Sequence, residues 1–345
     1  MCKAVLGSLS TYYFALYKAP KKVLHTLENI RRRFFGGGED RSRKISWVAW
    51  ERILCERKKG GLGVGSLRAL NIAMLGKWWW RERNETYSMW KSVVSLYNSA
   101  QSSNVSKSWI WGRIKNIDMD LSALGIDLQN YLQRKENGSG WLWTLDPSNS
   151  YTVRSLRLLI DNSLLPSFDS ETDWIRWVPS KANIHLWRVL CGRLATKDNL
   201  VKRGVEMQSL DCQMCHARDE TLDHVMVSCS TTRLVMAYLA RWIDWWPVSE
   251  TSVQSLWGAI CNGDGNGDNR DKVVRKVIGV AFLWTLWRLR NSKVFNQIII
   301  KEEEIYMNIQ FLAFEWIRGR CKLGKLLCWE KWICNLLHAV SLVSL

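Results

Sequence analysis

The chain has 345 residues, of which 47% are hydrophobic, and this is enough for two or three modest cores. Its 49 Lys and Arg residues outnumber its 32 Asp and Glu residues, so the net charge is +17 and a polyanionic partner is favoured. The apolar run from Val277 to Trp287 is shorter than the about 20 residues that a bilayer requires, so the sequence argues against a membrane protein.

The first hundred residues carry most of the positive charge, with 19 basic and 7 acidic side chains. Apolar residues at helical spacing predict one helix before Pro20 and a second over residues 21–35. Arg31, Arg32 and Arg33 lie near the end of the second helix, where cations interact favourably with the helix dipole. The three side chains suit this structural role and contacts to phosphate equally well.

A helical pattern resumes at residues 47–54, and the glycine-rich basic segment 57–65 follows it. This segment lacks the Gly-Lys-Ser/Thr ending of a phosphate-binding P-loop, and no predicted strand precedes it. We therefore expect a flexible basic turn with glycines at positive φ. Ser66 is predicted to cap a helix over residues 67–83. The apolar stripe of that helix is formed by Leu70, Met74 and Trp78.

Residues 98–108 are rich in Ser and Asn and predict a linker, which helical segments follow over residues 109–131. Aromatic and β-branched residues at 140–143 and 151–153 flank a Pro/Asn/Ser turn, and this pattern predicts one β-hairpin. Residues 262–269 look like half of a calcium loop. We expect a linker there, because no Glu stands at the twelfth position.

Further helices are predicted at residues 155–165, 180–191, 196–204, 230–242, 273–291 and 302–319. The predicted caps of three of them are Ser180, Thr196, and either Ser230 or Thr231. Cys191 shares an apolar helix face with Ile184 and Trp187, so we expect it in the core and not at a metal.

Four candidate metal ligands follow the pattern Cys-x2-Cys-x8-His-x4-Cys: Cys212, Cys215, His224 and Cys229. The first pair forms a tight knuckle that presents two thiolates, and the His and the last Cys can close a tetrahedron from a short helical turn. Zinc is the metal that binds three Cys and one His in a closed site, so we expect one structural Zn²⁺. The alternative is a group of buried cysteines beside a surface His.

A redox role for the Cys-x2-Cys pair is disfavoured, because no βαβ pattern surrounds it. His216 is a substitute candidate ligand, ranked below His224 because the apolar residues after His224 indicate packing that fixes its ring. The chain has ten cysteines and no recognisable signal peptide at its start. We therefore expect reduced thiols in an intracellular protein, nuclear or cytoplasmic and not secreted.

The ligand motif lies within a longer run of characteristic positions: Trp174, Trp177, Pro179, Lys181, Trp187, Arg188, Gly192, Arg193, Thr196, Gly204, Glu220 and Thr221. This run resembles the reverse transcriptase zinc-binding domain of plant non-LTR (LINE-type) retrotransposons. Residues 47–81 similarly resemble the segment after the polymerase thumb in those proteins, and residues 284–295 resemble their C-terminal tail. The resemblance implies a basic helical region at 1–97, a linker with helices at 98–139, the zinc-binding domain at 140–242 and a helical tail at 243–345.

The family is one of RNA-directed DNA polymerases, but this sequence contains no adjacent Asp-Asp pair to hold the two catalytic metal ions. A ribonuclease H carboxylate set, His-Glu-x-x-His and Gly-x-Ser-x-Gly are not recognisable either. We therefore expect a non-catalytic C-terminal fragment. Its expected fold is mainly α-helical, with one small β-hairpin and the Cys-Cys-His-Cys knuckle.

Nucleic acid, either RNA or DNA, is the expected partner; a membrane and a small-molecule substrate are not expected. The candidate contacts are Arg31, Arg32, Arg33, Lys58, Lys59, Lys77 and Arg81. The 22 tryptophans could stack on bases, but their helical spacing favours packing. Other interpretations are that the basic residues are solvated helix faces and that the chain is a zinc-stapled protein-interaction module or an inert, degenerate retroelement product.

Overall fold

The computed structural model describes residues 11–36, 45–84, 117–136, 138, 140–168, 171–243, 245–262, 269–297, 301–321, 324–334 and 336. The described chain is mainly helical with one two-stranded sheet, which confirms the predicted fold class. None of its helices combines the length and hydropathy that crossing a bilayer requires. The predicted linker at 98–108 and most of the calcium-loop-like segment lie outside the described residues.

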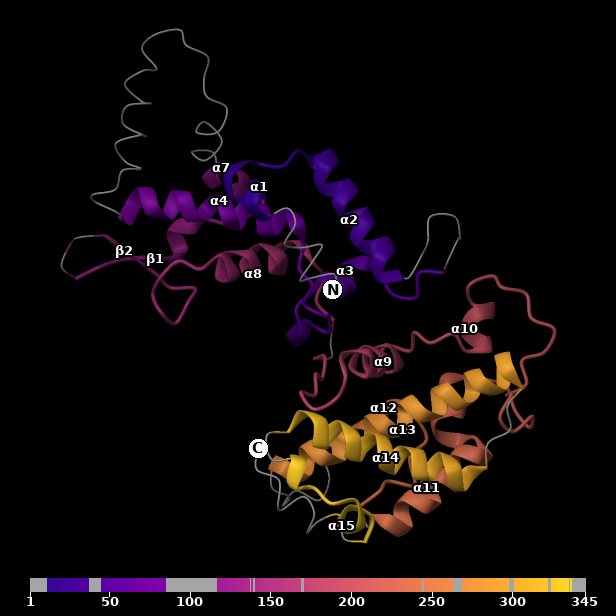
Figure 1. Cartoon of the computed structure of the whole chain (residues 1–345). Helices are drawn as coiled ribbons and strands as arrows, with labels where there is room; N and C mark the ends of the chain where they lie inside the picture. Colours follow the sequence, from indigo (N-terminus) through magenta and orange to yellow (C-terminus); the bar gives the residue numbers. More distant parts are fainter. Residues whose placement is uncertain are drawn as a thin grey trace. The chain divides into compact units, whose positions relative to one another are not determined.

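The chain divides into two compact units, Met1–Thr172 and Asp173–Leu345 (Figure 1). The boundary falls inside residues 140–242, which the sequence predicts to be one zinc-binding domain. The first unit contains 26 basic and 15 acidic residues, and the second contains 23 basic and 17 acidic residues. The excess of positive charge is therefore larger in the first unit.

The first unit is organised around α4 (Leu67–Asn84), which packs against α1, α7 and α8. Its other helical elements are α1 (Thr11–Leu16), α2 (Lys21–Gly36), α3 (Trp50–Leu54), η2 (Arg57–Lys59), α7 (Ile117–Ser122), η3 (Leu128–Tyr131) and α8 (Val153–Leu164). Because its neighbours contact α4 from several sides, buried residues such as Ala69, Asn71 and Leu75 lie all around it. The predicted stripe of Leu70, Met74 and Trp78 is only half-buried, so the predicted single apolar face was wrong.

The hairpin pairs β1 (Leu132–Arg134) with β2 (Trp141–Trp143) in antiparallel register. The predicted pairing of residues 140–143 with 151–153 was therefore wrong. Thr152 instead caps α8, because its hydroxyl accepts a hydrogen bond from the Ser155 N–H (3.1 Å) and donates one to the Asp146 carboxylate (2.8 Å). These bonds direct the chain after β2 into a helix and not into a second strand.

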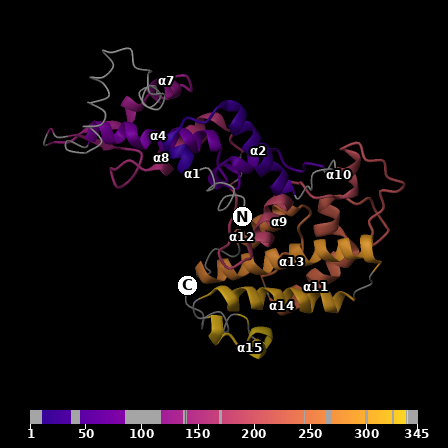
Figure 2. The same ribbon diagram turned by 45° about the horizontal axis from the view of Figure 1, so that its top comes forward.

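In the second unit α13 (Asn269–Asn296) and α14 (Glu302–Arg320) lie side by side (Figures 1 and 2). The remaining elements are α9 (Ser180–Leu190), α10 (Lys197–Val201), η4 (His224–Ser228), α11 (Ser230–Trp242), α12 (Val253–Asn262), η5 (Gly324–Leu326) and α15 (Trp329–Cys334). One hydrophobic core contains residues of helices α9, α11, α12, α13 and α14. It also contains residues of the metal-ligand motif, including Cys212, Val225 and Cys229. The motif is thus part of the main core of this unit.

The two predicted C-terminal helices are confirmed as α13 and α14, whereas α12 and α15 were not predicted. The predicted caps Ser180 and Ser230 or Thr231 were wrong, because the helices already include these residues. Pro179 and Cys229 occupy the cap positions, and neither makes a side-chain cap bond. Thr196 does stand at the cap position of α10, but its hydroxyl donates to Asp198 instead of accepting from a helix N–H.

Candidate metal centre

The structure brings the four candidate ligands together. The sulfur atoms of Cys212, Cys215 and Cys229 and a ring nitrogen of His224 all lie within 4.8 Å of one another. Ligand sulfurs around one tetrahedral zinc ion are about 3.8 Å apart, because each Zn–S bond is about 2.3 Å long. A contraction of about 1 Å in the longest separation would therefore let one ion contact all four atoms. His216 is exposed and does not belong to the cluster, and Cys191 also lies outside it.

Backbone hydrogen bonds shape the first half of the site. A β-bridge between Asp211 and Asp219 closes the loop, and the Cys212 N–H donates to the Arg218 carbonyl (2.8 Å). Within the loop, the Met214 N–H points at the Cys212 sulfur (3.4 Å). Amide dipoles directed at a sulfur stabilise its thiolate form, which is the form that binds metal. The loop thus presents both thiols of the Cys-x2-Cys pair from a fixed backbone.

The second half of the site is a single π-helical turn, η4, whose closing bond joins the Cys229 N–H to the His224 carbonyl (2.7 Å). A π turn adds one residue to a helical turn and is often found at functional sites. The turn therefore places Cys229, the fifth residue after His224, next to His224. The predicted short helical turn is therefore present, with a wider geometry than that of an α-helix.

The imidazole of His224 is oriented by contacts on both ring nitrogens. Nε2 lies 3.2 Å from the Cys215 sulfur, and Nδ1 lies 3.3 Å from the Ser228 hydroxyl. Nε2 is consequently the nitrogen that faces the other ligands. A partner on the opposite ring nitrogen fixes the tautomer and orientation of a ligating His. Sequence reasoning missed Ser228, because a serine four residues after a histidine carries no signal of its own.

Burial and charge make the cluster suitable for a cation. Cys212 and Cys229 are fully buried, His224 is 6% exposed, and Cys215 is half-buried. Desolvation, followed by the charge of Arg218, lowers the pKa of His224, so its ring is neutral near pH 7. A hydrogen bond from the Cys212 thiol lowers the pKa of Cys229, and the same bond raises the pKa of Cys212. Each thiol must lose its proton to bind a cation, so metal binding at this cluster would release protons.

Helix α13 supports the ligand segment (residues 210–229) from outside the motif. The Arg290 guanidinium donates to the buried Glu220 carboxylate, with an Nη2–Oε1 distance of 2.5 Å. Glu220 also accepts a bond from the Lys197 N–H (3.1 Å). One turn further along α13, Lys293 donates to the Met214 carbonyl (3.3 Å). The ligand segment is therefore held at both of its halves by one helix.

The candidate nucleic-acid residues lie on three elements of the first unit. Arg32 and Arg33 on α2, Lys58 on η2 and Lys77 on α4 are exposed, and Lys59 and Arg81 are half-buried. Arg81 lies over the ring of Trp78, 5.3 Å from its centroid. Arg31 is different, because only 2% of it is exposed. Of the two roles that the sequence left open for it, this burial favours the structural one.

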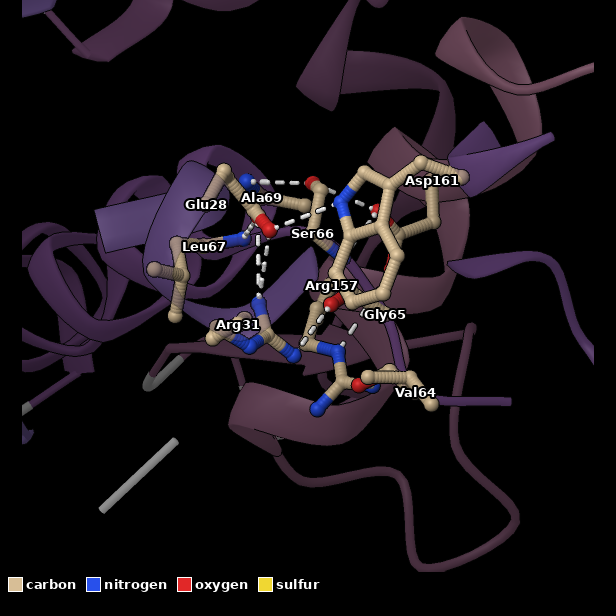
Figure 3. A network of polar contacts seen from close by, with 10 residues as sticks. Glu28, Arg31, Val64, Gly65, Ser66, Leu67, Ala69, Arg157 and Asp161 are labelled. Carbon is tan, nitrogen blue, oxygen red and sulfur yellow. Dashed lines mark hydrogen bonds and ion pairs between the residues drawn. The ribbon is translucent and has the colours of Figure 1, made fainter. Parts of the chain in front are cut away.

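Arg31 belongs to a buried network at the start of α4 (Figure 3). It donates to the Glu28 carboxylate (3.1 Å) and to the Gly65 carbonyl (3.1 Å). Glu28 in turn accepts from the Leu67 N–H (2.7 Å), and Ser66 Oγ accepts from the Ala69 N–H (3.0 Å). The predicted Ser66 cap is thus confirmed, and the Glu28 carboxylate satisfies a further N–H at the positive end of the helix dipole.

The glycine-rich segment contributes to the same network. Gly60, Gly63 and Gly65 have φ of 77°, 66° and 71°, which confirms the predicted positive φ values. The Arg157 guanidinium donates to the Val64 carbonyl (3.4 Å) and lies against Gly65. A Cβ at Gly65 would stand 1.9 Å from Arg157 Nη2. The segment is therefore a structural turn that packs against α8.

Comparison with known proteins supports the metal site. Residues 151–235 match the family described as zinc-binding in reverse transcriptase, and this range contains all four ligands. A protein of Arabidopsis thaliana whose name describes it as a ribonuclease H protein is 20% identical over 384 aligned positions, which cover 86% of this chain and 60% of that protein. An uncharacterized mitochondrial protein of the same plant is 35% identical over 72 positions, which cover 20% of this chain and 46% of that protein.

No solved structure matches the chain. The chain spans less than two thirds of the length of both relatives. The match to residues 151–235 coincides with the segment that resembles a reverse transcriptase domain, and the four ligands converge within it. Residues 151–235 are therefore similar to the zinc-binding region of reverse transcriptases, and they contain all four converging ligands.

Proposed function

We propose that the chain is a C-terminal part of a plant non-LTR retrotransposon reverse transcriptase that binds one structural zinc ion and associates with nucleic acid. The observation that supports this most directly is the convergence of three thiols and one imidazole inside a domain of the reverse transcriptase zinc-binding type. Three Cys and one His are a donor set that favours zinc over harder cations.

The zinc ion has a structural role in this proposal. Cys212, Cys215, His224 and Cys229 would fill all four positions of a tetrahedron, which leaves none for a substrate or a water molecule. When bound, zinc supplies folding free energy, because the ligands are brought together only in the folded state. The ligand segment has little regular structure between α10 and η4, so it depends on such a cross-link to remain closed.

Nucleic acid is proposed to bind mainly to the first unit. This unit has 26 basic against 15 acidic residues, and Arg32, Lys58 and Lys77 are exposed on three of its elements. Phosphate contacts of this kind give affinity without base specificity. In the proposal the chain itself performs no phosphoryl transfer, because its sequence lacks the adjacent aspartates that a polymerase uses.

Two measurements on the purified chain test the proposal. Elemental analysis should find one zinc per chain, and a Cys212→Ser/Cys215→Ser variant should lose it. Fluorescence anisotropy with a random-sequence single-stranded RNA should show affinity that falls steeply between about 50 and 200 mM salt. A folded wild-type chain without zinc would overturn the metal assignment, and an affinity unchanged by salt would overturn the nucleic-acid assignment.

A further inference from the structure

A cavity of about 230 Å³ lies in the first unit, where the α1–α2 connection meets α4 and α7. Four separate segments form its wall: the connection supplies Lys18, the first turn of α2 supplies Lys21, the start of α4 supplies Arg68, and α7 supplies Asp120. This site is distinct from the metal cluster and contains none of the residues predicted to contact nucleic acid.

The charge of the lining is positive. Lys18 forms an ion pair with Asp120, which neutralises both groups. Lys21 and Arg68 are exposed, and neither forms an ion pair with any residue that the structure describes. Lys21 and Arg68 therefore add two positive charges to a lining whose acidic residue, Asp120, is already paired with Lys18. Such a site attracts an anion, and a guanidinium beside an ammonium group is well suited to phosphate oxygens.

Asn71 holds the cavity in a defined shape. Its side chain is 2% exposed and all its hydrogen-bonding groups face the end of α1 and the connection that follows. Nδ2 donates to the carbonyls of Phe14 (3.0 Å) and Tyr17 (2.8 Å), and Oδ1 accepts from the Ala19 N–H (2.9 Å). The connection that carries Lys18 is therefore fixed to α4, and the cavity is preformed.

The remaining lining is largely apolar and includes Leu24 and Ile72. A ligand that matches both parts has a phosphate group and a planar or apolar group close to it. The cavity is smaller than the about 300 to 1,000 Å³ of sites for drug-sized ligands, so it has room for one phosphate and the group next to it, and not for a longer piece of a strand. We infer that this cavity binds one nucleotide, with its phosphate between Lys21 and Arg68 and its base or sugar over Leu24 and Ile72.

The nucleotide could be free or could be part of a bound strand, and only the second case rests on the proposed nucleic-acid function. The test uses the full chain and a Lys21→Ala/Arg68→Ala variant. The matched control is Lys135→Ala/Arg154→Ala, which removes two exposed cations of the same unit that lie outside the cavity and have no assigned role in binding. All four side chains are exposed, so neither variant is expected to unfold the protein.

Calorimetric titration with adenosine monophosphate should show binding to the wild type, and adenosine without phosphate should bind more weakly. The Lys21→Ala/Arg68→Ala variant should lose affinity for the nucleotide by about tenfold or more, and the control should change it less than about twofold. Hydrogen exchange should show slower exchange around residues 18–24 and 68–72 when the nucleotide is present. No nucleotide binding, or equal losses in both variants, would overturn the inference.

A competition experiment separates the inference from the proposed function. If the bound nucleotide belongs to a strand, adenosine monophosphate should displace a short single-stranded oligonucleotide from the wild type. If the oligonucleotide binds with salt dependence but the mononucleotide does not bind at all, the cavity assignment fails and the proposed function survives. If the mononucleotide binds but the oligonucleotide does not, the cavity is a site for free nucleotides and the nucleic-acid function fails.

Discussion

Arg290 and Glu220 form a buried ion pair that joins helix α13 to the ligand segment across 70 residues of sequence. Glu220 is fully buried and Arg290 is 4% exposed, so water can compensate neither charge. The matched family range ends at residue 235, and Arg290 lies well beyond it. The ligand segment therefore depends on a helix outside the range that matches the family.

Replacing Arg290 with Ala should lower the free energy of unfolding of the second unit by about 3 to 5 kcal/mol, because the Glu220 carboxylate would remain buried without a partner. Urea denaturation should show this loss. A Glu220→Gln/Arg290→Met variant, which removes both charges, should recover most of it. Arg318→Ala is the matched control, because that Arg pairs with Glu315 on the exposed surface and should contribute less than about 1 kcal/mol. A loss as small as the control's in Arg290→Ala would contradict this structural role.

Removal of metal should destabilise the second unit. A chelator or the Cys212→Ser variant should make residues 210–229 sensitive to protease, because this segment has few elements of regular structure. Cys334→Ser is the control, since Cys334 is exposed and lies outside the ligand cluster. Limited proteolysis followed by mass spectrometry locates the cut. Equal protection of the segment with and without chelator would show that metal does not hold it.

The metal site and the fold differ in how far they could be predicted from sequence. The ligand set is local, because four donors fall within 18 residues at spacings that one ion dictates. Long helices such as α13 and α14 were also predictable. The pairing of Glu220 with Arg290 could not be predicted, because contact between residues 70 positions apart depends on tertiary packing.

One wrong prediction and one question left open by the sequence have a similar cause. Residues 132–134 read Leu-Gln-Arg, which has no β pattern, so the true partner of β2 was overlooked. Three consecutive arginines suggested a common role, but helical geometry turns Arg31 towards Gly65 and leaves Arg32 and Arg33 exposed. In both cases the answer depends on which residues pack together in the folded chain, and the local sequence does not contain this information.

Ser228→Ala should weaken zinc binding by about tenfold, because the hydroxyl beside His224 Nδ1 orients the ligating ring. The affinity can be measured by competition with a coloured chelator at fixed pH. Ser230→Ala is a suitable control, since Ser230 is an exposed residue close in sequence. Identical zinc affinities in the two variants would show that Ser228 does not orient the ring.

Gly65→Ala should destabilise the first unit for two reasons. The backbone at Gly65 has a φ of 71°, which costs other residues about 1 to 2 kcal/mol. The added Cβ would also collide with Arg157 Nη2. Gly125→Ala separates the two effects, because Gly125 has a φ of 74° but nothing within 4 Å of the added Cβ. Thermal unfolding should show a larger loss for Gly65→Ala, and equal losses would mean that Arg157 moves aside at no cost.

His185 should make the second unit sensitive to acid. Burial lowers the pKa of His185 to about 4. The hydrogen bond between its Nε2 and the Leu283 carbonyl (3.3 Å) raises the pKa, but by less than burial lowers it. The ring packs against Trp284. The unfolded chain, with an ordinary pKa of about 6.5, binds a proton more readily than the folded one. The contribution of neutral His185 to the free energy of unfolding is therefore fully present above about pH 6.5 and is lost as the pH falls towards 4. At pH 5 the loss is about 2 kcal/mol.

The comparison protein for this pH effect is His185→Gln, whose side-chain amide can still donate to the Leu283 carbonyl but does not titrate. Metal ligands also take up protons in acid, but they are the same in both proteins. The difference in unfolding free energy between wild type and variant therefore isolates His185. Denaturation at pH 7.5 and pH 5 should show the wild type losing about 2 kcal/mol more than the variant. Parallel losses would mean that His185 is already charged in the folded protein, and that its contact with Trp284 tolerates the charge.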